Sequence, residues 1–528
     1  MNIVLTGYMG TGKTAVANEL QKQLGWEVID VDERIVIYEN STIDDIFTKK
    51  GEPYFRKVES KIIAELSNLD QKIIATGGGA VLNQSNIYTL KKNGLLICLS
   101  AQAEQIYQRL KGDNTRPLLK VSDPLATIKE MLKARANFYA NNNYKIETIN
   151  LTIQEVAKKI IKLMPQAIDV KLNQNPYKIY LNKPFQELVH FLPPAYKVLV
   201  ISDTHVAPKY LVDFMTSLKE KYNTNFHLIP SGEKYKNLSE ISKIYEAAIK
   251  HGLDRDSLII ALGGGVVGDM AGFAAATYLR GINYIQVPTT LLAQVDASIG
   301  GKTGVDLKHG KNLIGAFHQP SLVWIDPQFL NTLNDNEYRN GLAEVVKYSV
   351  ISQGTWDFLS SNIEKILKKE PKILKKMLEI SARAKAQVVS EDEKEAGLRK
   401  ILNLGHTLGH ALEANFNYEY KHGEMVAVGI IFASHLASKL KICNHNIETE
   451  LQKTLLKILP NSKDGSNLID KIKNKIKNKQ HLNHIMDIMA KDKKMSEGKI
   501  DFIVPEKIGK VRLESLQLDT IKDILSQW

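Results

Sequence analysis

The 528-residue chain predicts an α/β fold in two successive regions, followed by a region built of helices. Up to about residue 163, apolar runs such as NIVLT, KIIAT and LLICL alternate with helical patterns such as QEVAKKIIKL. The alternation resumes with KVLVISD, LIIALGGG and YIQVP up to about residue 330, and long helical patterns then take over. Because strands that alternate with helices usually pair in parallel, both α/β regions are expected to contain a parallel sheet.

The length of the chain and one polar segment predict three domains. A single core rarely extends beyond about 250–300 residues. The segment MPQAIDVKLNQNPYKIYLNKP, with Pro165 and Pro176, marks a boundary near residues 165–172. We therefore expect a first α/β domain at 1–165, with a parallel sheet and helices on both faces. A second α/β domain is expected at 166–330 and an all-α domain at 331–528.

The composition is that of an ordinary globular protein, with 44% hydrophobic and 24% charged residues. No apolar run approaches the roughly 20 residues that cross a bilayer. The opening MNIVLTGYMG lacks the basic and apolar regions of a secretion signal. Two cysteines, Cys98 and Cys443, are too few for a disulfide framework. We therefore expect a cytoplasmic protein without a membrane partner.

The net charge of +12 comes mainly from lysine, as in KIKNKIKNK at 471–479. Lysines on solvated helix faces explain this charge better than a nucleic-acid surface does. Aromatic residues are not interleaved with the lysines, and no DNA- or RNA-binding motif is present. Attraction of small anionic substrates is a third explanation. We expect no nucleic-acid partner.

The segment GYMGTGKT, at 7–14, fits the phosphate-binding pattern G-x-x-x-x-G-K-[ST]. It follows the strand NIVLT and opens a helix, which is the context that the motif requires. Its glycines let backbone N–H groups face phosphates, while Lys13 reaches the outer phosphates and Thr14 can hold Mg²⁺. The motif predicts a bound nucleoside triphosphate and leaves the phosphate acceptor unnamed.

Further motifs in the same region point to the acceptor. VIDVDERI ends a strand with Asp30 and Asp32, one suited to a metal-bound water and the other to accepting a hydroxyl proton. Together with FRK, TGGG, NTRPLL and KARANFY, these residues make 1–163 resemble shikimate kinase. Adenylate kinase and gluconate kinase are the nearest alternatives, and the combination of aspartate, arginines and triple glycine disfavours both.

The shikimate kinase resemblance implies a role for each of these residues. The ATP-binding positions would be Gly10, Thr11, Gly12, Lys13, Thr14 and the lid arginine Arg116, with Mg²⁺ held by Thr14 and Asp30. The shikimate-binding positions would be Asp32, Arg56, Gly77, Gly78, Gly79 and Arg135. Two arginines suit the shikimate carboxylate and a lid excludes water. The catalytic residues would be Lys13, Asp32 and Arg116.

A glycine turn in the second region, ALGGGVVGDMAGF at 261–273, fits G-x-G-x-x-G through Gly263, Gly265 and Gly268. The acidic residue expected about 20 positions later is missing, because that region reads YIQVPTT. Asp203, at the end of VLVISD, is the alternative ribose ligand. The polar segment at 294–320 is expected to be a long functional loop.

Three histidines, His406, His410 and His422, share the window LNLGHTLGHALEANFNYEYKHGE. They are compatible with a metal site, an acid–base relay or a polar patch on a helix. Periodicity alone pairs His406 with His410, four residues apart on one helix face, as in helical zinc sites.

Six motifs in a fixed order carry a second resemblance. SGEKYKN, GGGVVGD, ATYLRG, VPTTLLAQVDASIGGKTGVD, GLAEVVKY and LNLGHTLGHALE make the chain from about 170 to 528 resemble 3-dehydroquinate synthase. The resemblance implies a Zn²⁺ or Co²⁺ ion held by Glu344, His406 and His422. His410 would then be no ligand, but would lie close enough to donate protons or contact the substrate.

The family's reaction explains why NAD⁺ and a metal ion share one site. In 3-deoxy-D-arabino-heptulosonate 7-phosphate, C5 is oxidised with NAD⁺, phosphate leaves by β-elimination, and the ketone is reduced again by the same NADH. Ring opening and an intramolecular aldol closure then give 3-dehydroquinate, while the metal polarises the hydroxyl that is oxidised.

The family positions fall into three groups. The NAD-binding group is Asp203, Glu233, Lys236, Gly265, Asp269, Thr289, Thr290, Lys302, Lys311 and Thr332. The substrate-binding group is Arg280, Asp296, Lys302, Asn312, Lys347, Lys385, Arg399, Asn403 and His410. The catalytic group is Asp296, Lys302, Lys347, Glu395, Arg399 and His410. Lys493 and Lys494 also match a lysine pair of the family.

The two resemblances together predict a bifunctional enzyme of the shikimate pathway, which leads to chorismate and the aromatic amino acids. They also predict a homodimer formed through the synthase half. Two reactions separate the synthase product from the kinase substrate, so the fusion does not imply channelling. A polyol dehydrogenase dependent on iron or zinc is one alternative, although it would need no cationic cage for phosphate and carboxylate. A decayed, non-enzymatic half is the other.

Overall fold

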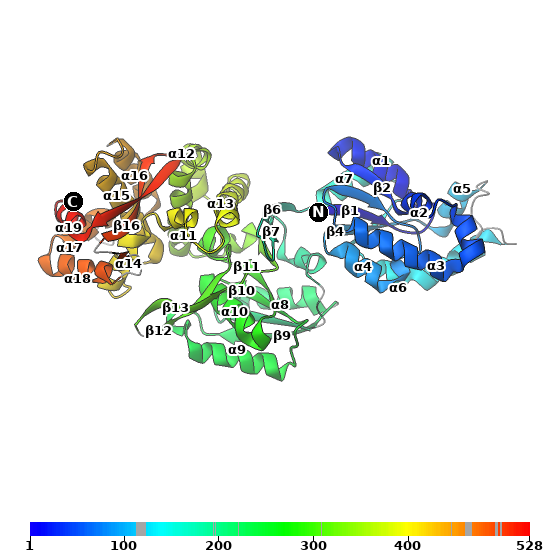
Figure 1. Ribbon diagram of the computed structural model, residues 1–528, viewed down its shortest axis with the longest axis horizontal. Coiled ribbons are helices and arrows are strands. Elements are labelled where there is room, and N and C mark those ends of the chain that lie inside the picture. The colour runs from blue at the N-terminus through cyan, green and yellow to red at the C-terminus, as the bar shows by residue number, and fades with distance from the viewer. Residues whose placement is uncertain are drawn as a thin grey trace. The chain divides into compact units, whose positions relative to one another are not determined.

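The computed structural model describes residues 1–111, 123–193, 195, 197–219, 221–307, 309–444, 446–459, 467–491, 495–496 and 499–528. The chain forms two compact units (Figure 1). Unit 1 comprises Met1–Pro165 and His190–Pro194, and unit 2 comprises Gln166–Val189 and Ala195–Trp528. Among the helices of these described ranges, none is both long and apolar enough to cross a membrane.

Unit 1 is built around a five-stranded sheet in which all neighbouring strands are parallel. The strand order is β2-β3-β1-β4-β5, with β1 at Asn2–Thr6, β2 at Glu27–Asp30, β3 at Lys72–Ala75, β4 at Gly94–Ser100 and β5 at Tyr144–Glu147. Alternate residues of β1 and β4 enter two separate hydrophobic clusters, because successive side chains of a strand point to opposite faces. Both faces of the sheet are therefore covered.

Helices supply the other half of each cluster. One face packs against α1 (Lys13–Leu24) and α7 (Ile153–Leu163). The other cluster takes side chains from α2 (Val31–Glu39), α3 (Ile43–Leu66), α4 (Gln84–Lys91), α5 (Ala103–Leu110) and α6 (Pro124–Ala140). The predicted α/β domain with a parallel sheet and helices on both faces is confirmed. The loops that follow β1, β2 and β3 all leave the same edge of this sheet, because parallel strands share their carboxyl ends.

Unit 2 begins with a seven-stranded sheet of order β6-β7-β14-β11-β10-β8-β9. Its strands are β6 (Gln166–Val170), β7 (Tyr177–Leu181), β8 (Lys197–Asp203), β9 (Asn223–Ile229), β10 (Leu258–Gly263), β11 (Asn283–Pro288) and β14 (Leu322–Ile325). All pairs are parallel except β6 with β7. The segment that we expected only to mark a boundary thus contains two strands, because its apolar residues alternate and enter the core.

The order of these strands shows where the sheet opens a crevice. From β8 the chain moves to β9 on one side, whereas from β10 it moves to β11 on the other. Ligands of open α/β sheets bind outside the carboxyl ends of the strands at such a change of direction. Asp203 ends β8 and Gly263 ends β10, and α10 (Gly265–Thr277) starts directly after the glycine turn. These residues therefore flank the crevice.

The segment 294–320 is not the single long loop that the sequence suggested. It contains a π-helical turn at Ala293–Ala297 and an antiparallel hairpin of β12 (Lys302–Leu307) with β13 (Gly310–Phe317). Thr303 and Val305 are buried, and pairing in the hairpin satisfies the backbone groups that a buried loop would leave unpaired. Its glycines permit the pairing: a Cβ on Gly304 would lie 2.5 Å from a carbonyl oxygen of β13.

The rest of unit 2 is mainly helical, as predicted. Its helices are α11 (Asp335–Ile351), α12 (Gln353–Leu367), α13 (Pro371–Glu391), α14 (His406–Asn415), α15 (His422–Lys439), α16 (Asn446–Ile458), α17 (Leu468–Ile476), α18 (Lys479–Ala490) and α19 (Leu518–Ser526). It also holds a small antiparallel sheet formed by β15 (Met495–Ser496), β16 (Lys499–Lys507) and β17 (Lys510–Gln517). This sheet was not expected, although KVRLESLQ alternates apolar and polar residues as an amphipathic strand does.

Candidate active sites

The phosphate loop of unit 1 has the backbone geometry that its glycines predict. Gly7, Gly10 and Gly12 have φ angles of 131°, 73° and 94°, a region that residues with a side chain rarely adopt. Lys13 donates from Nζ to the carbonyls of Gly7 at 2.8 Å and Tyr8 at 3.2 Å. The ammonium therefore lies against the loop that is expected to hold phosphates.

The other nucleotide-site positions follow along the chain. Thr11 closes the loop by donating its hydroxyl to a loop carbonyl at 2.8 Å, and Thr14 is exposed on the first turn of α1. Asp30 ends β2 and accepts the N–H of Asp32 at 2.9 Å, so one of its oxygens already caps α2. The sequence predicts Asp32 at the end of the strand, but it lies in the first turn of α2. Arg116 lies outside the described residues.

Two glycines after β3 allow an aspartate and an arginine to approach the backbone. A Cβ on Gly77 would lie 2.7 Å from Oδ1 of Asp32. A Cβ on Gly79 would overlap the guanidinium of Arg56. A side chain at either position would displace one of these two polar groups.

Arg135 reaches the same turn from α6. It donates to the Gly78 carbonyl at 3.4 Å, and Tyr139, one helical turn later, donates to the same oxygen at 2.9 Å. The guanidinium carbon of Arg135 lies 5.8 Å from the centroid of the Tyr8 ring. The structure thus brings the expected aspartate and both expected arginines to one triple-glycine turn.

Glu59 belongs to this group of side chains, and sequence reasoning missed it. Its side chain is fully buried, and Oε2 lies 2.8 Å from a guanidinium nitrogen of Arg56, while Glu52 contacts the same guanidinium from the exposed side at 3.0 Å. Burial raises the pKa of Glu59, and Arg56 opposes that rise. The signal available in the sequence was the spacing of three residues after Arg56, which places the carboxylate on the same helix face.

A buried carboxylate faces two histidines in unit 2. Glu344, on α11, has no exposed surface, and its Oε1 lies 3.5 Å from Nε2 of His406 and 3.6 Å from Nε2 of His422. Lys347 forms an ion pair with its Oε2. Apart from that ion pair, neither oxygen of Glu344 accepts a well-formed hydrogen bond from the described residues. Buried oxygens left in this way and facing imidazole nitrogens fit a divalent ion that takes nitrogen and oxygen ligands.

The far nitrogen of each imidazole is anchored. Nδ1 of His406 lies 3.1 Å from the carbonyl of Leu404, and Nδ1 of His422 lies 3.2 Å from Oε1 of Glu413. Because a carbonyl or carboxylate oxygen only accepts, each contact places a proton on Nδ1. Burial holds the pKa of His406 well below its ordinary value, so its Nε2 keeps a lone pair for a metal. Burial would also lower the pKa of His422, but Glu344 and Glu413 outweigh it and raise that pKa to about 9, so His422 must release its Nε2 proton when a metal binds.

His410 lies in the same cluster. One nitrogen from each of His406, His410 and His422 lies within 4.8 Å of the others. The four side chains therefore offer one more donor than the three assigned to the metal from the sequence.

Electrostatics favour the metal-binding forms of the two most buried groups. Burial by itself would raise the pKa of Glu344, but Lys347 and His406 outweigh it and lower that pKa to about 2. Burial lowers the pKa of His406 well below its ordinary value. An ionised carboxylate and a neutral imidazole are the protonation states that coordinate a metal ion.

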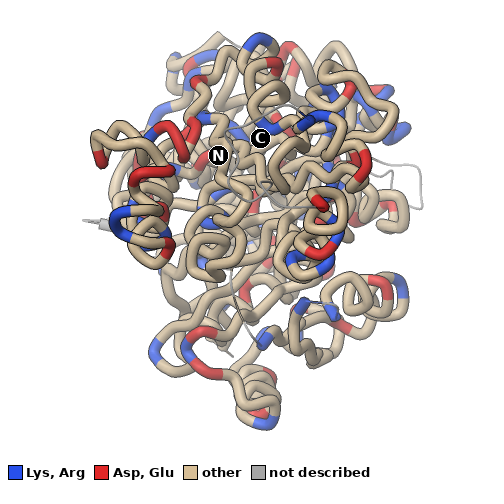
Figure 2. Tube along the Cα trace, turned by 90° about the vertical axis from the view of Figure 1, so that its right-hand side faces the viewer, with Lys and Arg blue, Asp and Glu red and all other residues tan. Residues whose placement is uncertain are grey.

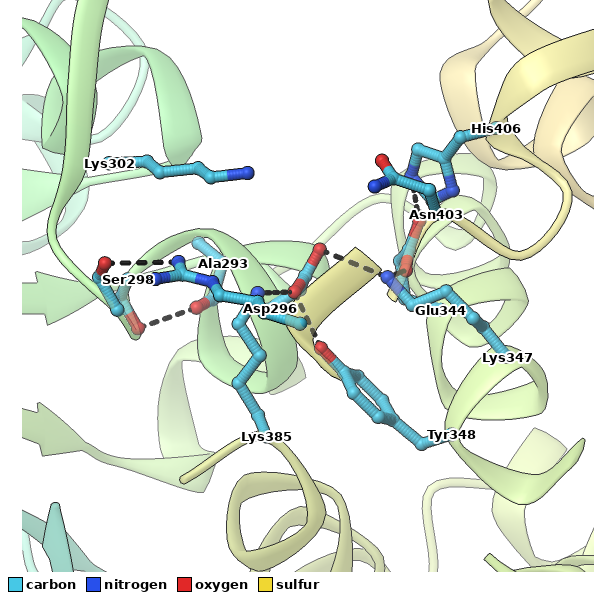
Figure 3. Close-up of polar contacts among 12 residues, drawn as sticks. Ala293, Asp296, Ser298, Lys302, Glu344, Lys347, Tyr348, Lys385, Asn403 and His406 are labelled. Atoms are coloured by element: carbon cyan, nitrogen blue, oxygen red, sulfur yellow. Dashed lines mark hydrogen bonds and ion pairs between the residues drawn. The ribbon is translucent and has the colours of Figure 1, made fainter. Parts of the chain in front are cut away.

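Asp296 is the centre of a second buried cluster (Figure 3). It lies on the π-helical turn and is contacted by Tyr348 at 2.5 Å, by Lys347 at 3.5 Å and by Lys385. Burial would raise the pKa of Asp296, but the two ammonium groups lower it well below its usual value. Burial also lowers the pKa of Lys385 to about 8. Two cationic side chains and one ionised carboxylate are thus held together with little exposure to water.

Tyr348 was not among the residues selected from the sequence. It is fully buried and lies one helical turn after Glu344, so the same helix face carries the expected metal ligand and a donor to Asp296. The motif GLAEVVKY contains this residue, but a tyrosine at helical spacing is more often a core residue than a polar contact.

A third group of side chains continues the charged surface. Lys302 forms an ion pair with Glu395, and Asn403 donates to the other oxygen of Glu395 at 2.8 Å. Glu395 has a φ of 61°, in the left-handed region. Arg399 is almost fully buried and donates to the Gly300 carbonyl at 3.0 Å, while its Nε finds no partner within the described ranges. These residues come from the hairpin and from the segment before α14.

The expected NAD-binding residues gather near the crevice between β8 and β10. Nζ of Lys236 lies 2.6 Å from both Oδ2 of Asp269 on α10 and Oδ1 of Asn312 on β13. Asp203 accepts two backbone N–H groups of the turn that follows it, at 2.7 and 2.9 Å. The N–H of Thr289 donates to the Gly263 carbonyl at 2.9 Å. Glu233 opens the short helix at Glu233–Tyr235, beside Lys236.

Four further positions have other surroundings. Thr290 accepts the N–H of Ala293 at 3.2 Å, and Thr332 bonds to Tyr210. Nζ of Lys311 lies 3.9 Å from Glu413. Arg280 is exposed and has a φ of 67°. Within the described residues, no hydrogen bond or ion pair joins it to the Asp296 cluster. Lys493 and Lys494 lie outside those residues.

The fold and the sites define a two-part enzyme: a phosphate-loop kinase unit and a unit with an α/β crevice beside a buried histidine–carboxylate cluster. Protein-family models match the chain as "Shikimate kinase" at residues 9–165, "3-dehydroquinate synthase N-terminal" at 226–340 and "3-dehydroquinate synthase C-terminal" at 341–495.

Curated relatives agree with these matches. The 3-dehydroquinate synthase of Picosynechococcus sp. is 45% identical over 371 residues, covering 68% of this chain and 97% of the relative. The chloroplastic 3-dehydroquinate synthase of Arabidopsis thaliana is 41% identical over 349 residues, covering 64% of this chain and 76% of the relative.

A solved structure resembles the second unit. The crystal structure of 2-deoxy-scyllo-inosose synthase complexed with carbaglucose-6-phosphate, NAD⁺ and Co²⁺ superposes with a TM-score of 0.61 at 26% identity, covering 69% of this chain and 99% of that one. The chain belongs to the 3-dehydroquinate synthase family. Its first part is a shikimate kinase domain, so the whole is a bifunctional fusion of shikimate-pathway enzymes.

Proposed function

We propose that unit 1 phosphorylates shikimate with ATP to give shikimate 3-phosphate, using the residues that meet at the triple-glycine turn. Arg56 and Arg135 would hold the carboxylate of shikimate, since the two guanidinium groups reach this turn from two different helices, α3 and α6. Asp32 would accept the proton of the attacking hydroxyl, and Lys13 would hold the phosphates. Mg²⁺, when bound by Thr14 and Asp30, would neutralise phosphate charge.

Unit 2 would convert 3-deoxy-D-arabino-heptulosonate 7-phosphate to 3-dehydroquinate and phosphate. The observation that carries this proposal is the buried cluster around Asp296. Lys347, Lys385 and Arg399 are three buried cations, against the two carboxylates of Asp296 and Glu344, and this excess of positive charge suits a substrate that bears a phosphate and a carboxylate. Asp296, held ionised by the two lysines, would accept a hydrogen bond from a substrate hydroxyl.

The cofactors would occupy the two places whose residues fit them. NAD⁺ would lie in the crevice flanked by Asp203 and the glycine turn, and when bound it supplies the hydride acceptor and donor. A Zn²⁺ or Co²⁺ ion would be held by Glu344, His406 and His422, and when bound it polarises a substrate hydroxyl. The 2-deoxy-scyllo-inosose synthase that superposes on unit 2 was crystallised with NAD⁺ and Co²⁺, which supports both assignments.

His410 would act on protons. It shares the cluster of His406 and His422 and lies on the same helix as the first of these, one turn later. A neutral imidazole within reach of the substrate can take up or release a proton near physiological pH.

The first experiment follows phosphate release from the heptulosonate phosphate with catalytic NAD⁺ and added Co²⁺. We expect release with wild type and Lys13→Ala, and loss of release with His406→Ala. Glucose 6-phosphate serves as a second substrate, because the structurally similar synthase was crystallised with a carba analogue of it. Release from glucose 6-phosphate alone would replace the synthase assignment with that of a different sugar phosphate cyclase.

The kinase is tested separately with shikimate and ATP. We expect phosphorylation by wild type and His406→Ala, and its loss in Lys13→Ala. Wild type that hydrolyses ATP equally well with and without shikimate would contradict the acceptor assignment.

A homodimer formed through unit 2 and a cytoplasmic location are also proposed. The first rests on the family resemblance, and the second on the cysteine content: Cys98 and Cys443 are both free thiols. Light scattering on the full chain and on unit 2 measures the first, and cell fractionation measures the second. A monomer at micromolar concentration would contradict the dimer.

A further inference from the structure

The two histidines that face Glu344 are held in place by different means. Nδ1 of His406 donates to a main-chain carbonyl, that of Leu404, at 3.1 Å. Nδ1 of His422 instead lies 3.2 Å from a side-chain carboxylate, Glu413. A main-chain anchor cannot be removed by substitution, whereas a side-chain anchor can. The cluster therefore offers a direct test of what an anchor contributes.

Helix geometry brings Glu413 to this position. It lies on α14, seven residues after His406 and three after His410, and residues three and seven apart share one face of a helix. His422 is the first residue of α15, which packs against α14. The side chain of Glu413 is only 4% exposed, so its contact with His422 lies away from water.

His422 needs an anchor more than His406 does. Its side chain is 30% exposed, against 11% for His406, and it stands at the start of its helix. Packing therefore restricts the rotation of its imidazole less than it restricts that of His406. With Nδ1 bound to Glu413, Nε2 points to Glu344 at 3.6 Å. Without that bond, the ring is free to turn about χ2 and present either nitrogen.

Glu413 also lies near Lys311, but that contact is the weaker one. Nζ of Lys311 is 3.9 Å from the carboxylate, at the limit of an ion pair, and its side chain is 32% exposed. Ion pairs of such exposed lysines contribute about 0–1 kcal/mol. The contact of Glu413 with His422 is shorter, and the carboxylate that makes it is buried. We therefore take His422 to be the main partner of Glu413.

We propose that Glu413 is a positioning residue that orients His422 for metal binding by accepting its Nδ1–H. The inference rests on the proposed function, in which His422 is a ligand of the metal. Glu413 itself contacts neither the metal nor the substrate. A carboxylate that accepts from a ligating histidine typically contributes about 10- to 100-fold to metal affinity.

The test measures Co²⁺ binding to the full chain without NAD⁺ or substrate, by competition with a chromophoric chelator. We expect Glu413→Ala to weaken Co²⁺ binding about 10- to 100-fold relative to wild type. Glu413→Gln, whose carboxamide oxygen still accepts from Nδ1, should recover most of that loss. The visible absorption of bound Co²⁺ should change in Glu413→Ala and return towards wild type in Glu413→Gln, because it reports ligand geometry.

Glu419→Gln is the matched control. Glu419 follows six residues later, its side chain is 62% exposed, and it pairs with Lys475 at 3.6 Å on the surface. Its Co²⁺ affinity and spectrum should equal those of wild type. Thermal unfolding of the metal-free variants identifies any that fail to fold, and Glu413→Gln then serves alone as the comparison with His422→Ala.

The outcomes separate this inference from the proposed function. If His406→Ala binds Co²⁺ as tightly as wild type does, the metal site itself is overturned. The other outcome is that Co²⁺ binding depends on His406, but Glu413→Ala has the affinity and spectrum of wild type. That result would overturn the role of Glu413 and leave the metal site standing.

Discussion

The side chains at the triple-glycine turn of unit 1 and the cluster around Glu344 and Asp296 in unit 2 hold cationic groups in different surroundings. In the proposed function, both groups bind an anionic substrate. In unit 1 the arginine Arg56 stays 26% exposed and gathers with its partners around glycines. In unit 2 the lysine Lys347 is 1% exposed and lies between the fully buried carboxylate of Glu344 and that of Asp296, which is 18% exposed.

The difference has an energetic consequence. A charge that keeps contact with water loses little when its partner is removed, whereas a buried charge left unpaired costs about 3–5 kcal/mol. Unit 2 is therefore expected to tolerate changes at its site less well than unit 1 does. Basic and acidic residues are mixed along the Cα trace (Figure 2), so this contrast concerns the interior of the sites and not a separation of charge along the chain.

The largest effect is expected for Glu344→Gln. The change removes one of the three proposed metal ligands and leaves Lys347 with one carboxylate fewer in a dry site. The rate of phosphate release should fall roughly 10³-fold or more, because the activation free energy rises by about 4 kcal/mol. The free energy of unfolding should fall by about 3–5 kcal/mol. Parallel phosphate-release and kinase assays on one preparation check this. Kinase activity lost together with synthase activity would contradict the independence of the two sites.

Lys13→Ala is the corresponding change in unit 1. Loss of one positioned cation should lower kcat/KM for shikimate phosphorylation by about 10²- to 10³-fold. Stability should change by less than in Glu344→Gln, because Lys13 is half-buried whereas Glu344 has no exposed surface. Kinase kinetics and thermal unfolding of the same protein give both quantities. Destabilisation as large as that of Glu344→Gln would remove the contrast between the two units.

Tyr348→Phe should have an intermediate effect. It removes one hydrogen bond to the ionised Asp296 and keeps the packing of the ring. Hydrogen bonds to charged groups contribute about 1.5–3 kcal/mol, so kcat/KM of the synthase should fall roughly 10- to 100-fold. Steady-state phosphate release at several substrate concentrations measures it. An unchanged kcat/KM would mean that the two lysines alone hold Asp296.

The smallest effects are expected for substitutions of Glu59 and Glu52, the two carboxylates that contact Arg56. Glu59 is buried and Glu52 is 58% exposed, yet both contact Arg56. Glu59→Gln should raise the KM for shikimate about 5- to 30-fold, corresponding to about 1–2 kcal/mol, whereas Glu52→Gln should change it by less than about 3-fold. Kinase kinetics at saturating ATP decide. Equal effects of the two variants would show that burial does not govern the strength of these pairs.

Much of the fold followed from the sequence because its signals are local. KVLVISD and LIIALGGG are long apolar runs that end in turn residues, and they are the strands β8 and β10 of unit 2. The glycine loop 7–14 is defined by φ angles that few other residues adopt. The hairpin at 302–317 was missed because its polar, glycine-rich sequence reads as a loop until its pairing partner is known.

The sites were predictable only in part. Lys13 and the triple glycine stand in short motifs, and the positions of Glu344 and His406 came from a resemblance. Glu59, Tyr348 and Glu413 escaped notice, because the role of each depends on a contact with another side chain of its site, and those contacts are visible only in the folded structure. His406 and His410 were the pair that helical spacing selects, yet the contacts of Glu344 are with His406 and His422.

The sequence by itself determined the alternation of strands and helices in the two α/β regions, the phosphate loop and the identity of the charged residues. These depend on backbone conformation and on hydrophobic periodicity, which act over a few residues. Only the tertiary structure decided which charges meet. Asp296, Lys347 and Lys385 come from three separate elements, and their ionisation depends on the burial that those elements create together.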